Sequence, residues 1–101
     1  MRNVLLATCV GLLFCVVGCA SSQRTLQAGC ATCIFDMKGV TGCPLAVKVA
    51  GQPYLVEGVK MDQLGDAHAA DGLCNVERTV KAEGKIKGDR FVATSMEIVQ
   101  Q

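Results

Sequence analysis

An alternation of apolar and polar residues in the second half of the chain constrains the fold more than any other feature. Between Val76 and Ile86 the odd-numbered residues are all polar. The even-numbered residues are apolar or glycine, with Arg78 as the one exception. A period of two indicates a β-strand with one solvated face. Lys87-Gly88-Asp89 predicts a tight turn. Residues 91–99, apolar on both parities, then predict a second strand that lies centrally or closes a barrel.

The first half of the chain repeats this pattern in a weaker form. Residues 45–50 alternate, Gly51-Gln52 predicts a turn, and residues 53–57 return as the next strand. Residues 30–38 are the candidate for a first strand. Between the two hairpins, residues 65–72 (GDAHAADG) predict one or two helical turns, with Asp66 as a cap and Gly72 at the end.

The predicted order of elements is three strands, a short helix and two more strands. This order resembles the plan of OB-type barrels, which place a helix between the third and fourth strands. We therefore predict a mainly β protein, a small OB-like five-stranded barrel with one short helix between strands 3 and 4. The alternative is an open antiparallel α+β sheet with the helix on one face.

The N-terminal residues predict export. Arg2 precedes an uncharged run from Val4 to Gly18, which is shorter than the about 20 residues of a membrane-spanning helix. Val16-Val17-Gly18-Cys19 resembles the lipobox of bacterial lipoproteins. That resemblance implies that Cys19 is acylated on sulfur, becomes the new N-terminus and is acylated there as well. Two or more acyl chains give stable membrane anchoring. The alternative is an ordinary signal peptide that contains a cysteine by chance.

These features divide the chain into three parts. We predict a lipoprotein signal peptide over residues 1–18, a lipidated cysteine with a polar tether over 19–28, and the OB-like domain over 29–101. The predicted location is the bacterial envelope. Because no aspartate follows Cys19, the outer membrane facing the periplasm is favoured where a cell has two membranes.

Charge and composition narrow the classes of partner. The chain has ten Lys and Arg against nine Asp and Glu, and removal of the leader takes Arg2 with it and leaves a neutral protein. A neutral protein lacks the excess of positive charge that attracts the phosphates of nucleic acid. No triad-like order of Ser, His and Asp stands out, so we expect no enzyme. The expected partners are the membrane, through the anchor, and another envelope protein.

Four cysteines remain in the exported part besides Cys19, namely Cys30, Cys33, Cys43 and Cys74. Export permits disulfides. A domain of about seventy residues has a small hydrophobic core and is usually stabilised further by disulfides or a metal ion. Two disulfides are therefore the first interpretation, with three connectivities open. We favour Cys30 and Cys33 each reaching to Cys43 and Cys74, in an order that the sequence leaves open.

Metal binding is the second interpretation of the same cysteines. Four thiolates, or three with the imidazole of His68, suit zinc, while thiolate with thioether suits Cu(I). As an alternative to a role as a metal ligand, His68 is a surface residue beside Asp66 and Asp71. A redox pair at Cys30-x-x-Cys33 ranks third, because the residues that follow Cys33 read as a strand rather than as the helix of a thioredoxin-like site.

Three segments carry a wider resemblance. CATCIFDMKG, GCPLAVKVAGQPYLVEG and GDAHAADGLCN resemble an uncharacterised family of small, cysteine-containing bacterial envelope proteins, over Cys30 to about Ile98. The resemblance implies a shape and no chemistry. The first hypothesis is thus a lipid-anchored, non-catalytic interaction module stabilised by disulfides. A soft-metal (Zn or Cu) binding protein is the alternative, and a thiol redox protein is the third.

Overall fold

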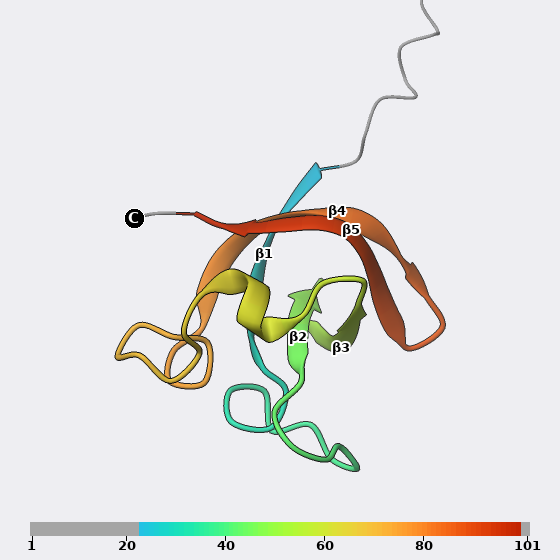
Figure 1. Ribbon diagram of the computed structural model, residues 1–101. Helices are drawn as coiled ribbons and strands as arrows, with labels where there is room; N and C mark the ends of the chain where they lie inside the picture. Colours follow the sequence, from blue (N-terminus) through green and yellow to red (C-terminus); the bar gives the residue numbers. More distant parts are fainter. Residues whose placement is uncertain (1–22, 100–101) are drawn as a thin grey trace, which may run out of the picture.

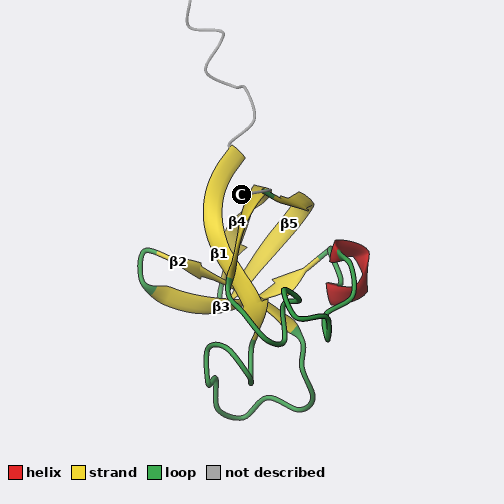
Figure 2. Ribbon diagram, turned by 90° about the vertical axis from the view of Figure 1, so that its left-hand side faces the viewer, coloured by secondary structure: helices red, strands yellow, loops and turns green. Residues whose placement is uncertain are grey.

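The computed structural model describes residues 23–99, so the predicted signal peptide, lipobox and Cys19 lie outside the described residues. Residues 23–99 form five strands and a short 3-10 helix (η2, Met61–Leu64). Figures 1 and 2 show the strands wrapped around one another, with η2 to one side. The strands are β1 (Gln23–Cys30), β2 (Leu45–Val49), β3 (Gln52–Glu57), β4 (Arg78–Lys87) and β5 (Arg90–Ile98). Within residues 23–99, no helix is long and apolar enough to cross a membrane.

The strands form a closed barrel in the order β1-β2-β3-β5-β4. All neighbours are antiparallel except β3 and β5, which are parallel. The predicted OB-like, mainly β fold is confirmed, and the two predicted hairpins form β2–β3 and β4–β5. β1 closes the barrel because it pairs with β4 along most of its length and with β2 at its end.

Apolar side chains from every strand fill the barrel. Val80 and Ala82 of β4 are buried while Lys81 between them is exposed, as the alternation predicts. Val76 and Ile86, on the same parity, are both 37% exposed, because Val76 precedes β4 and Ile86 lies close to the hairpin turn. The buried core cluster consists of Leu26, Ala28, Leu45, Val47, Val59, Leu73, Val80, Ala82, Phe91 and Ala93.

A β-bulge explains why β5 is apolar on both parities. Gly84 pairs with Ala93 and Glu83 pairs with Ser95, so Thr94 is an extra residue in β5. The extra residue shifts the alternation by one. Phe91 and Ala93 before the bulge, and Met96 and Ile98 after it, therefore all contact the core. A Cβ at position 84 would collide with the backbone of Val92 and Ala93, so the bulge requires glycine there.

The structure corrects two predicted elements. The first strand is Gln23–Cys30 rather than residues 30–38, so the barrel includes residues 23–28 of the predicted tether. Residues after Cys30 turn instead, with Asp36 and Gly39 at positive φ, which breaks an extended strand. Residues 65–72 form successive turns and no helix, and the short helix lies earlier, at Met61–Leu64.

Candidate thiol and metal centre

Three separate segments bring four cysteines to one end of the barrel. Cys30 is the last residue of β1, Cys33 lies in the turn that follows, and Cys43 precedes β2. Cys74 lies in the connection between η2 and β4. Figure 1 shows the 31–44 loop and the orange part of this connection at the lower end of the barrel, opposite the end where β1 begins. We call the sulfur atoms of these four residues the four-sulfur cluster.

Cys43 is the centre of the four-sulfur cluster. It forms a disulfide with Cys30, with 5.2 Å between the Cα atoms. The Sγ atom of Cys43 also lies 3.2 Å from that of Cys74 and 3.8 Å from that of Cys33. The Sγ atoms of Cys30, Cys33 and Cys43 all lie within 4.8 Å of one another. A single sulfur thus contacts the other three.

The four residues differ in exposure and environment. Cys30 is fully buried, Cys43 and Cys74 are half-buried, and Cys33 is exposed. The backbone N–H of Cys33 donates a hydrogen bond to the Sγ of Cys30, at 3.2 Å. Burial, and after it the neighbouring Cys33, raises the pKa of the Cys74 thiol. The cluster therefore runs from a sulfur open to solvent to one that solvent does not reach.

Backbone hydrogen bonds shape the turn that carries Cys33. The amides of Ile34 and Phe35 both donate to the carbonyl of Cys30, at 2.9 and 3.3 Å, which folds residues 30–35 back on themselves. Gly29 has no room for a side chain, because a Cβ there would collide with Ile34. The amide of Ala31 donates to the carbonyl of Pro44 at 2.8 Å, which holds Cys43 beside the end of β1.

The neighbour of Cys74 fixes its position. Leu73 is 1% exposed and belongs to the core cluster, so it anchors this segment to the barrel. Its carbonyl accepts a hydrogen bond from the amide of Cys30 at 2.9 Å. The amide of Cys74 donates to the carbonyl of Ala67, also at 2.9 Å. Core packing and these bonds bring Cys74 to the cluster from 44 positions beyond Cys30.

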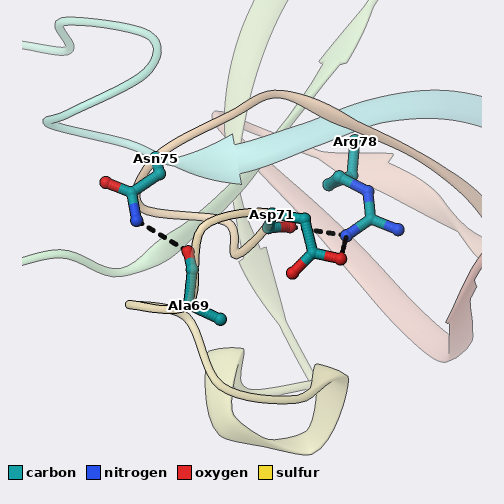
Figure 3. Close-up of polar contacts among 4 residues, drawn as sticks. All are labelled: Ala69, Asp71, Asn75 and Arg78. Carbon is teal, nitrogen blue, oxygen red and sulfur yellow. Dashed lines mark hydrogen bonds and ion pairs between the residues drawn. The ribbon is translucent and has the colours of Figure 1, made fainter.

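Polar side chains brace the loop on either side of Cys74 (Figure 3). The side-chain amide of Asn75 donates to the carbonyls of His68 and Ala69, at 3.2 and 2.7 Å. The guanidinium of Arg78 donates to the carbonyl of Asp71 and lies 3.6 Å from its carboxylate. These contacts satisfy backbone carbonyls of the GDAHAADG turns. The motif therefore serves to hold the backbone that carries Cys74.

The predicted site residues separate into two groups. All four cysteines lie together, and the bonded pair Cys30–Cys43 is one of the pairings that the sequence left open; Cys33 and Cys74 are not bonded to each other. His68 is exposed and lines a pocket beside η2 with Lys60 and Met61. Among residues 23–99, the group with metal-binding geometry consists of Cys30, Cys33 and Cys43 and contains neither His68 nor Cys74, whose sulfur contacts that of Cys43 at 3.2 Å.

Sequence reasoning missed the residues that position Cys74. Leu73 and Asn75 flank it directly, but neither forms part of a periodic pattern. Arg78 did carry a signal, since it is the one charged residue on the apolar parity of β4. In the structure the guanidinium of Arg78 lies beside the carboxylate of Asp71 rather than in the apolar core.

The spacing of the sulfur atoms allows two kinds of chemistry. Four thiolates at about 2.3 Å from one tetrahedral ion lie about 3.8 Å apart, as Cys33 and Cys43 do here. Adjacent sulfurs also exchange disulfide bonds, because exchange begins with attack of a thiolate on a neighbouring disulfide sulfur. When reduced, the sulfurs of Cys30, Cys33 and Cys43 could hold a metal ion, and when oxidised Cys30 and Cys43 form a disulfide.

A family model described as a family of unknown function (DUF6370) matches residues 24–99, and the chain belongs to this family. The match covers all of the barrel except Gln23 and includes all four cysteines of the cluster, in agreement with the predicted resemblance to an uncharacterised family. No curated protein and no solved structure matches the chain.

Proposed function

We propose that the protein binds a soft metal ion, Zn²⁺ or Cu(I), through Cys30, Cys33, Cys43 and Cys74. The observation that carries the proposal is the convergence of four sulfur atoms from three segments around Cys43. Thiolates select these ions over hard cations. The backbone N–H of Cys33 donates a hydrogen bond to the sulfur of Cys30, which holds these two ligands of the proposed site side by side. Binding requires two electrons and two protons to open the Cys30–Cys43 bond first, supplied by a thiol reductant.

The second candidate function is the interaction module stabilised by disulfides. The bonded Cys30–Cys43 pair favours it, because it staples the 31–44 loop to the end of β1. In this case the barrel presents a surface to another envelope protein and the cysteines are structural. Neither function requires catalysis, and we propose a binding role for the protein.

We further propose that acylation of Cys19 holds the protein at the envelope membrane. Only three residues separate Cys19 from the start of β1 at Gln23, and they span at most about 14 Å. β1 then runs for eight residues away from this point to Cys30. The four-sulfur cluster would therefore face away from the membrane, where soluble ions and partners reach it. Mass spectrometry of the purified chain should find acyl groups on Cys19, and an unmodified Cys19 would contradict the anchor.

Metal titration of the full chain tests the metal site. The protein is purified in detergent, reduced with a phosphine, and offered Zn²⁺ or Cu(I) under anaerobic conditions. We expect one ion per chain and protection of all four cysteines from alkylation, mapped residue by residue. Cys43→Ser should weaken binding by at least about tenfold. His68→Ala is the matched control and should leave binding unchanged.

Two results would decide against the metal site. Reduced protein that takes up neither ion, and whose Cys30–Cys43 bond re-forms on exposure to air, supports the disulfide-stabilised module. Loss of binding in His68→Ala, with Cys43→Ser unaffected, would place any site at η2 rather than at the four-sulfur cluster.

A further inference from the structure

The Cys30–Cys43 disulfide includes a sulfur that no external molecule can reach. Cys30 is fully buried, so a disulfide or thiol from solvent cannot attack it directly. Cys33 is exposed, and its sulfur lies 3.8 Å from that of Cys43. Cys43 is only half-buried, and the exposed Cys33 is the most accessible sulfur beside it, so we expect electrons to enter or leave the pair mainly through Cys33.

We propose that the four-sulfur cluster exchanges disulfides with external compounds. Cys33 attacks the substrate, and the disulfide ends between Cys43 and the fully buried Cys30. The substrate class is an accessible disulfide, either of a small thiol compound or of an exposed protein segment. This activity goes beyond metal binding and needs no ion, although it uses the same sulfurs.

The exchange begins at the solvent-exposed residue. The thiolate of Cys33 attacks one sulfur of the external disulfide and bonds to it, and the other half leaves as a thiolate that takes up a proton. The thiolate of Cys43 then attacks the sulfur of Cys33. A Cys33–Cys43 bond forms, and the second half of the substrate leaves as a thiol.

The last step moves the bond into the interior. The thiolate of Cys30 attacks the sulfur of Cys43, the Cys30–Cys43 bond forms, and Cys33 leaves as a thiolate that takes up a proton. The hydrogen bond from the N–H of Cys33 to the sulfur of Cys30 keeps these two residues side by side at the end of β1. In total, Cys30 and Cys43 lose two electrons and two protons, and the external disulfide becomes two thiols.

Cys74 offers a competing route into the disulfide. Its sulfur is closer to Cys43 than that of Cys33 is, at 3.2 Å. It is, however, half-buried, so an external disulfide reaches it less easily than it reaches the exposed sulfur of Cys33. Exposure and proximity thus favour different cysteines, and the two variants Cys33→Ser and Cys74→Ser separate them.

The test uses the reduced full chain in detergent with a chelator present, and glutathione disulfide as the probe. Samples are quenched with acid, and adducts and disulfides are mapped by mass spectrometry. We expect a transient glutathione adduct on Cys33, followed by the Cys30–Cys43 bond. Cys33→Ser should slow formation of that bond at least about tenfold and by more than Cys74→Ser does, while His68→Ala, outside the cluster, should leave the rate unchanged. All variants are checked for folding by circular dichroism.

An adduct on Cys43 or Cys74 of the wild-type protein, with an unchanged rate in Cys33→Ser, would overturn the proposal. The wild-type adduct decides the question even if a variant fails to fold. A peptide that contains a disulfide is the second probe. If the natural substrate is a small disulfide, the peptide should react more slowly than glutathione disulfide, and if it is a protein segment, the peptide should react at least as fast. Because the chelator removes metal, failure of metal binding leaves this result unaffected.

Discussion

The barrel and its sulfur-bearing end are held together by different forces. The barrel is a continuous hydrogen-bonded ladder around a buried apolar cluster. The end that carries the four-sulfur cluster consists of turns, and no residue of the 31–44 loop belongs to that core cluster. Sulfur contacts, backbone hydrogen bonds and the braces of Asn75 and Arg78 hold it instead.

This difference separates stability from chemistry. Burial of apolar surface does not depend on the redox state or the metal content of the solution. The barrel can therefore stay folded while the cysteines change partners. Leu73 and Cys30 lie at the boundary, because each is buried against the barrel and also takes part in the sulfur-bearing end.

The largest expected effect is on the barrel. Phe91 is fully buried, and its loss to alanine alone would cost about 3–5 kcal/mol. Phe91→Asp adds an unpaired buried charge, so we expect the domain not to fold in any state of the cysteines. Lys81→Asp, at an exposed position of β4, should change the free energy of unfolding by less than about 0.5 kcal/mol. Circular dichroism and urea denaturation compare the two, and equal effects would mean that the strand faces are assigned wrongly.

Opening the disulfide should have the next largest effect. The bond joins residues 13 positions apart, and closing a loop of this size contributes about 3 kcal/mol in the chain-entropy account. Reduction with a chelator present should lower the urea midpoint while the β signal in circular dichroism persists. Cys33→Ser, which leaves the bond intact, is the control. Complete unfolding on reduction would show that the sulfur-bearing end supports the barrel after all.

The fold could largely be predicted because the strands follow local rules. The parity of Val80 and Ala82, and the turns at Gly51 and Gly88, require no knowledge of distant residues. The first strand escaped prediction because Gln23–Cys30 mixes polar and small residues and is a strand through its pairing with β4 and β2. The bulge at Thr94 escaped it for a related reason, since a shift of parity looks the same as a strand buried on both faces.

The sequence predicted which residues form the site, but it did not predict how they are arranged. The predicted export and an even count of cysteines singled out Cys30, Cys33, Cys43 and Cys74. Their convergence depends on the packing of Leu73 and on the turn after Cys30, and neither has a periodic signature. His68 stood out only as the single histidine, whereas its main-chain carbonyl is what the structure uses at this site, as an acceptor for Asn75.

A smaller effect is expected from the brace of the Cys74 loop. Asn75→Ala removes the hydrogen bonds to the carbonyls of His68 and Ala69 and should cost about 1–2 kcal/mol. It should also make Cys74 react faster with iodoacetamide. Gln63→Ala is the matched control, because its exposed amide accepts a hydrogen bond from the backbone of Lys60, away from the cluster. If both variants leave the reactivity of Cys74 unchanged, the brace does not position this residue.

The smallest expected effect concerns pH. Burial, and secondarily Cys33, raises the pKa of Cys74 above its ordinary value of 9.0, so the folded state holds this proton more tightly than the unfolded chain does. The resulting stabilisation is complete below the ordinary pKa and is lost as the pH rises through the folded pKa. With the Cys30–Cys43 bond intact, urea denaturation between pH 7 and about 10 should show a steeper fall for the wild type than for Cys74→Ser. Cys33→Ser should give an intermediate slope, because it removes the second cause and leaves burial. Identical slopes in all three proteins would show that Cys74 titrates as in the unfolded chain and that its sulfur is open to water.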